Sequence, residues 1–283
     1  MKLEVVKLSD YNLVEFIELV NCIFEDYLIP IKWDVYNFEL DARENSISFD
    51  DSFIFLEDGS PISFVLLCLR KNRARIDAMG VVKEKRGMGV GNYMIEYVIE
   101  KLRWKGVNSI VLEVIENDEK TIKFYMKNKF RHVRKLLSLI REDLPSGHEW
   151  NYVKSNNTRI YGLSANAEKI FRRRLNWQRE PLTLMLSEDR YDMREVKHKG
   201  KVLGYLVWGE KEDGTFIVDC APSDPSVSFA DILEDSLKYI KDMTNTKFVQ
   251  LMNLPEDDPL NDAAKMMNFS KFIGQFEMER RIR

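Results

Sequence analysis

The segment of this sequence that is best suited to ligand binding is Arg86-Gly87-Met88-Gly89-Val90-Gly91. In it, three glycines alternate with other residues. Because glycine has no Cβ, its backbone adopts unusual φ and ψ values and approaches a ligand closely. A strand-like run at 76–82 precedes the segment, and a helix-like run at 93–105 follows it. The free N–H groups and the dipole of a helix start favour an anion. We therefore interpret the segment as a pyrophosphate-binding loop, to which Arg86 adds a fixed positive charge.

Two common phosphate-binding motifs do not fit the spacing of these glycines. A Walker loop needs Gly, four residues and then Gly-Lys-Ser/Thr, a pattern that is absent near the loop. A dinucleotide-binding fingerprint needs glycines at positions one, three and six. The sixth position is Asn92 when counted from Gly87, and Met94 when counted from Gly89. Both interpretations are therefore disfavoured.

The remaining pattern, Arg-x-x-Gly-x-Gly between a strand and a helix, resembles the acyl-CoA-binding motif of the GCN5-related N-acetyltransferases (the GNAT family). In that family, the strand before the loop carries a β-bulge that separates it from the next strand, and Gly80 suits such a break. The resemblance implies that backbone groups of Met79 and Val81 hold the pantetheine arm and polarise the thioester carbonyl. It implies acetyl-CoA as the co-substrate, with its pyrophosphate on the six loop residues, and it covers roughly residues 2–140.

A second part of the resemblance follows the loop at 124–130, where the sequence reads Phe-Tyr-Met-Lys-Asn-Lys-Phe. It is similar to an aromatic-Tyr-x-Lys-x-Gly-Phe run of the family, except that Lys129 replaces the glycine. The resemblance implies that Tyr125 lies beside the CoA sulfur and acts as the general acid; the alternative is an aromatic residue that packs in the core. The family often has an asparagine near the pantetheine, seven residues before this tyrosine. Here Asp118 takes that place and Asn117 precedes it, so either could provide the contact.

The implied reaction is the attack of a neutral amine on the thioester of acetyl-CoA. A lysine-type amine has a pKa of about 10.4, so it must lose a proton before it attacks, and a general base is useful. Asp77 shares strand parity with Met79 and Val81, so we expect it to face the cleft. Glu113 and Glu116 are alternatives, and each of these carboxylates is also explained as an exposed or salt-bridged residue.

The chain length of 283 residues predicts two domains. A segment rich in Pro, Gly and charged residues at 143–149 is the expected linker, because Pro and Gly break both helices and strands. The expected fold class is α/β (α+β), with two tandem GNAT-like domains at 1–142 and 150–283. Each is expected to have a mixed, mostly antiparallel sheet flanked by helices.

The second half of the sequence repeats the pattern of the first. Strand, loop, helix, strand, short helix and strand follow one another at 76–139 and again at 215–278. At 224–230 the second copy reads Asp-Pro-Ser-Val-Ser-Phe-Ala, without glycine, and Pro225 lacks a donor N–H. We therefore expect a degenerate second domain without a pyrophosphate loop. Outside the repeat, 182–186 is predicted as a strand.

The composition limits the kinds of partner and the cellular compartment that we expect for this protein. The net charge of −3 gives no reason to expect nucleic acid, and the longest apolar run, 64–69, is too short to span a membrane. The cysteines and the histidines show no metal-ligand spacing, and the widely spaced cysteines indicate a reduced, cytoplasmic protein. A run of three arginines at 172–174 is predicted to form a solvated helix face, and the alternative is a helix face that contacts an acidic partner.

These patterns together predict an N-acetyltransferase that transfers an acetyl group from acetyl-CoA to a primary amine, without a metal. The acceptor would be a small molecule or a peptide, and its identity is left open by the sequence. The alternative is a non-catalytic, regulatory acyl-CoA-binding module.

Overall fold

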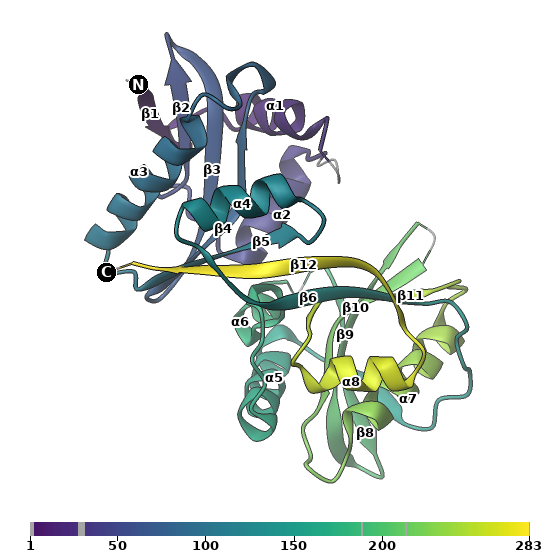
Figure 1. Cartoon of the computed structure of the whole chain (residues 1–283). Helices are drawn as coiled ribbons and strands as arrows, with labels where there is room; N and C mark the ends of the chain where they lie inside the picture. Colours follow the sequence, from purple (N-terminus) through teal and green to yellow (C-terminus); the bar gives the residue numbers. More distant parts are fainter. Residues whose placement is uncertain (1–2, 28–31, 188, 213, 283) are drawn as a thin grey trace. The chain divides into compact units, whose positions relative to one another are not determined.

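The computed structural model describes residues 3–27, 32–187, 189–212 and 214–282, and the chain forms two compact units (Figure 1). Unit 1 comprises Met1–Val114, Asp118–Val133 and Glu277–Arg283, and unit 2 comprises Ile115–Asn117 and Arg134–Phe276. Neither unit is one continuous stretch of chain.

The sheet of unit 1 has the strand order β1-β2-β3-β4-β5, and β12 follows β5. The strands are β1 (Glu4–Lys7), β2 (Phe53–Glu57), β3 (Ser60–Arg70), β4 (Arg73–Val81), β5 (Ser109–Ile115) and β12 (Ser270–Arg281). Strands β1 to β4 pair in antiparallel fashion, whereas β4 and β5 are parallel. Strand β12 contributes its residues from Glu277 onward to this unit.

The helices of unit 1 cover both faces of its sheet. They are α1 (Leu13–Phe24), α2 (Val35–Asn45), α3 (Val90–Trp104) and α4 (Glu119–Lys127). Figure 1 shows α1 and α2 on one side of strands β2–β4 and α3 on the other. Asn12 begins α1 by accepting hydrogen bonds from two backbone N–H groups of its first turn. The apolar face expected for α3 is buried and contains Val90, Met94, Ile95, Val98, Ile99 and Leu102.

A β-bulge interrupts the pairing of β3 with β4. Leu66 pairs with Ala78 and Leu67 pairs with Ile76, so Asp77 is the extra residue. Gly80, where the sequence suggested the break, pairs regularly with Phe64. That suggestion is therefore wrong, and Gly80 has a different reason: a Cβ there would lie 2.4 Å from Cγ2 of Ile23.

Unit 2 repeats this topology with the strand order β7-β8-β9-β10-β11-β6. The strands are β6 (Arg131–Arg141), β7 (Asn151–Lys154), β8 (Asp192–His198), β9 (Lys201–Lys211), β10 (Gly214–Pro222) and β11 (Val249–Pro255). Strands β10 and β11 are parallel and the other neighbours are antiparallel. The helices are α5 (Asn157–Phe171), α6 (Pro181–Leu186), α7 (Phe229–Met243) and α8 (Pro259–Met266). The predicted fold class is confirmed, since each unit has a mixed, mostly antiparallel sheet flanked by helices.

Residues 182–186 form part of helix α6, so the strand predicted there is wrong. Pro181 stands in the first turn of this helix, where its fixed φ and missing N–H are favourable. A short apolar run has no periodicity that distinguishes a strand from a buried helix.

The boundaries of the two units differ from the continuous domains expected at 1–142 and 150–283. Residues 134–142 and the expected linker 143–149 belong to unit 2, whereas the last residues of the chain belong to unit 1. Each unit is therefore completed by a strand from the other half of the sequence. Whether the two halves descend from one duplicated domain stays a prediction.

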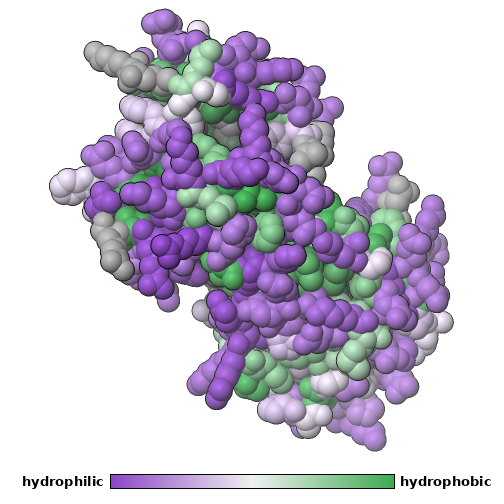
Figure 2. Space-filling view, viewed as in Figure 1, coloured by the Kyte–Doolittle hydropathy of each residue, from purple (hydrophilic) through white to green (hydrophobic). Residues whose placement is uncertain are grey.

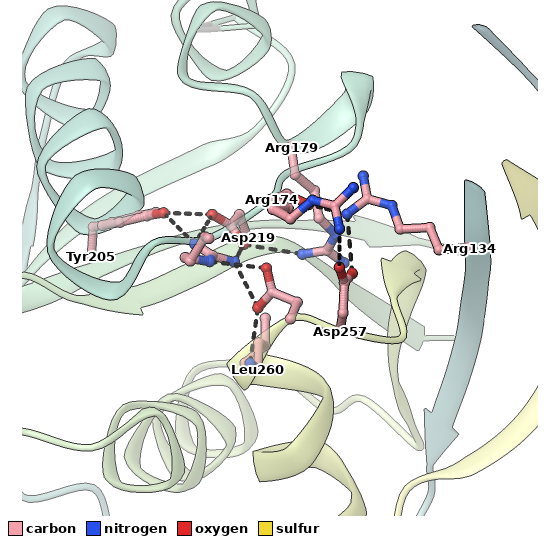
Figure 3. Close-up of polar contacts among 9 residues, drawn as sticks. Arg134, Arg174, Arg179, Tyr205, Asp219, Asp257 and Leu260 are labelled. Carbon is pink, nitrogen blue, oxygen red and sulfur yellow. Dashed lines mark hydrogen bonds and ion pairs between the residues drawn. The ribbon is translucent and has the colours of Figure 1, made fainter. Parts of the chain in front are cut away.

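The arginine run of unit 2 is not the solvated helix face that the sequence predicted. Arg172 has a φ of 51° and ends α5, and Arg173 after it is buried. Arg173 donates hydrogen bonds to Asp219 at 2.8 Å and to Asp258 at 3.0 Å, and all three side chains are 0% exposed. Arg179 also binds Asp219, and Figure 3 shows this cluster with Tyr205 beside it.

The charges of this cluster compensate one another inside unit 2. Burial alone would raise the pKa of Asp219, but the Arg173 and Arg179 guanidinium groups hold it below its ordinary value. The carboxylate therefore stays ionised in the protein interior.

The face of the molecule in Figure 2 is mostly hydrophilic, with smaller apolar areas between the charged side chains. No helix within the described ranges is long and apolar enough to cross a membrane. Among the same residues, no cluster of three or more His, Cys, Asp or Glu side chains is arranged to hold a metal ion.

Candidate functional site

A cavity of about 490 Å³ lies in unit 1, where the end of α1, β4, the glycine loop and α4 meet. Its lining residues are Ile23, Asp26, Tyr27, Met79, Gly80, Val81, Lys85, Arg86, Gly87, Gly89, Val90, Gly91, Asn92, Asp118, Lys120, Thr121, Phe124 and Tyr125. The volume is within the range of small-molecule sites. A larger depression of about 700 Å³ between β1 and α3 is lined by none of the site residues that the sequence predicts.

The glycine loop has the backbone that its sequence predicts. Gly87 and Gly89 have φ values of 80° and 88°, in the left-handed region where other residues are strained. Gly89 is the N-cap of α3 and offers no side-chain cap, and the first turn of that helix contains no acidic residue. The first N–H groups of α3 therefore remain available for an anion.

Gly91 allows α3 and α4 to approach each other at the cavity. A Cβ on Gly91 would lie 3.0 Å from Cζ of Phe124, which is tighter than ordinary carbon–carbon contacts. Met88, in contrast, points outward: it is 60% exposed and is not among the lining residues. Of the predicted loop residues, five therefore line the cavity and Met88 does not.

Arg86 lines the cavity, but its positive charge is not free. Nη1 and Nη2 each donate a hydrogen bond of 3.0 Å to the Asp26 carboxylate. Nη2 also binds the carbonyl of Ile23 at 2.8 Å, and Nε binds the carbonyl of Val81 at 2.9 Å. The hydrogen bonds from Arg86 hold the pKa of Asp26 below its ordinary value. The sequence offered no signal for this pairing, because Asp26 and Arg86 lie far apart along the chain.

Strand β4 diverges from β5 as it approaches the cavity. Within the described part of the chain, the pairing of these strands includes Arg73, Ala74 and Arg75 and stops before the bulge. Met79 and Val81 follow the bulge and line the cavity. Backbone groups on this side of β4 are therefore not used by β5.

Tyr125 lines the cavity and is only 8% exposed. Its ring packs against those of Phe124 and Phe130, with centroid distances of 5.0 and 5.4 Å. Tyr125 therefore packs among aromatic rings and also borders the cavity, and its role as the general acid stays a prediction. Burial raises the pKa of Tyr125, and the nearby Tyr27 and Asp118 raise it further. The hydroxyl is protonated at neutral pH, as a proton donor must be.

Tyr27 is a cavity residue that sequence reasoning missed. It follows α1 and lines the cavity together with Thr121 of α4. Burial is the main cause of its raised pKa. No motif marks this tyrosine. The available signal was on α4, where Thr121 and Tyr125 are four residues apart and so share one face.

The two alternatives for the pantetheine contact, Asn117 and Asp118, differ in their position relative to the cavity. Asp118 lines the cavity, and its Oδ1 caps α4 by accepting the N–H of Thr121 at 3.0 Å. Asn117 belongs to unit 2 and is not among the lining residues.

Asp77, the expected base, does not line the cavity. Its Oδ1 binds Nη1 of Arg75 at 2.7 Å, and Glu113 lies 3.5 Å from Nη2 of the same guanidinium. Burial alone would lower the pKa of Arg75, but Glu113 and Asp77 raise it. The parity argument for Asp77 was wrong because the bulge shifts the alternation of β4 at this residue. Glu116 is in unit 2, where it pairs with Lys271.

Comparison with known proteins gives a family match for the N-terminal part of the chain. Residues 13–130 match the acetyltransferase (GNAT) family, and no curated protein sequence matches the chain.

Several solved structures share the fold over nearly the whole chain. A tandem GNAT protein from the clavulanic acid biosynthesis pathway has a TM-score of 0.71 at 12% identity and covers 100% of this chain and 99% of its own. A GCN5-related N-acetyltransferase from Sphaerobacter thermophilus has a TM-score of 0.69 at 12% identity, with 99% and 96% covered. A GCN5-related N-acetyltransferase from Kribbella flavida has a TM-score of 0.64 at 14% identity, with 99% and 71% covered. At these identities the likeness shows the fold, which is the expected tandem GNAT arrangement.

Proposed function

Because residues 13–130 match the acetyltransferase (GNAT) family and the whole chain has a tandem GNAT fold, we propose that this protein transfers an acetyl group from acetyl-CoA to a primary amine. One observation carries the proposal: a single cavity of unit 1 is lined by the glycine loop, the diverging end of β4 and Tyr125. These three features match, in turn, the phosphates, the thioester and the leaving sulfur of an acyl-CoA. The acceptor is a small molecule or a peptide with a primary amine.

The glycine loop is the proposed site of the pyrophosphate. The positive φ values of Gly87 and Gly89 allow the backbone to turn its N–H groups toward a ligand. The uncapped start of α3 adds a partial positive charge. Both contributions come from the main chain, so they suit any anion of this size and do not select the acyl group.

The end of β4 is the proposed site of the pantetheine arm and the thioester. Met79 and Val81 line the cavity beyond the point where β4 separates from β5. A backbone N–H on this strand would stabilise the negative charge that develops on the thioester oxygen during attack.

Tyr125 is the proposed general acid. In the reaction, the amine nitrogen attacks the thioester carbon, the C–S bond breaks, and the departing sulfur takes a proton from the phenol. The phenol is protonated at neutral pH before that step. The phenolate that results regains its proton from solvent before the next turnover.

Asp77 is retained as the proposed base, with a restriction that comes from its position. Its carboxylate binds Arg75 and does not line the cavity, so it would receive the proton of the acceptor through water. Asp77→Asn is therefore expected to change the pH dependence of turnover and to leave acetyl-CoA binding unchanged.

Turnover of Tyr125→Phe tests the proposed acid. Removing a general acid costs about 10²-fold or more in rate, so release of free CoA thiol at saturating acetyl-CoA should fall by that factor. Tyr93→Phe is the matched control, since Tyr93 packs near Phe55 and does not line the cavity. An equal rate for Tyr125→Phe and the wild type would contradict the assignment.

The second candidate function is a non-catalytic module that binds acyl-CoA. Calorimetric binding of acetyl-CoA without thiol release, across a panel of amines, would favour this alternative. The three free cysteines suit a reducing compartment such as the cytoplasm, which is where we place either function.

A further inference from the structure

The end of α1 forms one wall of the cavity and contacts β4 and the glycine loop. Ile23 packs on β4, where its Cγ2 takes the space of a Cβ on Gly80. The Ile23 carbonyl and the Asp26 carboxylate bind Arg86 of the glycine loop. Tyr27 lines the cavity together with Thr121 and Tyr125 of α4. We call residues 23–27 the α1 wall.

Arg86 holds this wall with most of the donors that it has. A guanidinium carries five N–H donors in a fixed fork, and Arg86 makes four hydrogen bonds of 2.8–3.0 Å to Val81, Ile23 and Asp26. The Ile23 carbonyl lies in the last turn of α1, where backbone acceptors have no partner inside the helix. Arg86 therefore caps α1 and joins it to the end of β4.

The positive charges next to the glycine loop are compensated by acidic residues of unit 1. Asp26 pairs with Arg86 at 3.0 Å and lies 3.9 Å from Lys83, and Lys85 pairs with Glu57. To bind the Arg86 guanidinium, a phosphate would have to displace the Asp26 carboxylate, which accepts two hydrogen bonds from it. At the start of α3, in contrast, no side chain caps the main-chain N–H groups, so a phosphate would displace no capping group there.

We propose that Arg86 is a positioning residue, which fixes the α1 wall against the glycine loop and β4 and does not itself bind the pyrophosphate. The nature of the ligand rests on the proposed function, whereas the contacts of Arg86 do not. Since Ile23 and Tyr27 belong to the wall that Arg86 fixes, loosening it disturbs the part of the cavity assigned to the acyl arm.

Two acyl donors distinguish positioning from phosphate binding. S-Acetylpantetheine carries the thioester and the arm of acetyl-CoA but has no pyrophosphate. If Arg86 positions the wall, Arg86→Gln lowers kcat/KM for both donors by the same factor, about tenfold for the loss of charge-assisted hydrogen bonds. If Arg86 binds the pyrophosphate, the loss is confined to acetyl-CoA, and that result would overturn the proposal. Lys123→Gln, at a lysine whose side chain is 75% exposed on α4, is the matched control.

The direction in which a second substitution changes the affinity for CoA gives a test that does not depend on turnover. Asp26→Asn removes the charge that opposes Arg86, so a phosphate-binding Arg86 would be released and CoA would bind more tightly. A positioning Arg86 instead loses part of its anchor, so the calorimetric Kd for CoA stays equal or rises. Tighter binding by Asp26→Asn would refute the proposal even if Arg86→Gln did not fold. If the wild type released no thiol from either donor, the proposed acetyl transfer would fail, and the CoA titration would still decide the role of Arg86.

Discussion

The two units make the same turn from a strand into a helix with opposite consequences. In unit 1, β4 leads into α3 through Gly89, which has no side chain to cap the helix. In unit 2, β10 leads into α7, where Ser228 Oγ accepts the N–H of Asp231 at 3.0 Å and Asp231 accepts the N–H of Ser228 at 3.1 Å. The first helix start is left open for an anion, and the second is satisfied by its own serine and carboxylate. A shared topology therefore does not imply a shared site.

The residues around the two turns reinforce this difference. In unit 1, the end of β4 lines a cavity. In unit 2, β10 carries Asp219, which is buried with Arg173 and Arg179 in a compensated cluster (Figure 3). Asp224, in the turn itself, bonds with Ser226 and pairs with Lys201. We infer that unit 2 keeps the architecture for packing, while unit 1 keeps it for a ligand.

The largest expected effect concerns the buried cluster of unit 2. Arg173→Met leaves Asp219 and Asp258 without their shared partner, and breaking a buried pair costs about 3–5 kcal/mol. Denaturant unfolding should show this loss, while the chains that stay folded bind acetyl-CoA as before. Arg174→Met is the matched control: its side chain is 70% exposed, and a pair of that kind contributes about 0–1 kcal/mol. Equal losses of unfolding free energy for the two variants would contradict the structural role assigned to the buried cluster of unit 2.

The smallest expected effect concerns the helix cap of α7. Ser228→Ala removes the capping hydroxyl and should lower the free energy of unfolding by about 1 kcal/mol. Acetyl-CoA affinity should be unchanged, since this turn is not the proposed site. Asn156→Ala is the control, because Asn156 caps α5 in the same way. A change in acetyl-CoA affinity with Ser228→Ala alone would show that the two turns are less different than their caps indicate.

The sequence predicts what local patterns determine. The apolar periodicity of α3, the alternating glycines and the tyrosine of α4 each depend on residues that are close together in the sequence. The structure places the glycine loop and Tyr125 at one cavity. The glycine loop was recognisable because its backbone demands a particular residue type.

The features that the sequence missed depend on contacts between distant residues. The bulge at Asp77 is a matter of pairing between β3 and β4, and it reversed the expected orientation of the candidate base. Arg86 pairs with Asp26, which is 60 residues away in the sequence, and Arg173 pairs with Asp219, which is 46 residues away. The completion of unit 1 by β12 also has no local signal, so a chain cut after residue 146 would lack a strand of unit 1 as well as most of unit 2.

A calorimetric titration of the full chain with acetyl-CoA tests most directly whether the molecule has one working loop. We expect one site per chain, with binding weakened at least 100-fold in the variant Gly87→Val with Gly89→Val, because valine is strained at both positive φ values. Gly200→Val, at a hairpin glycine of unit 2 with a φ of 80°, should cost similar strain and leave binding intact. Two sites per chain, or undiminished binding by the double variant, would contradict the account.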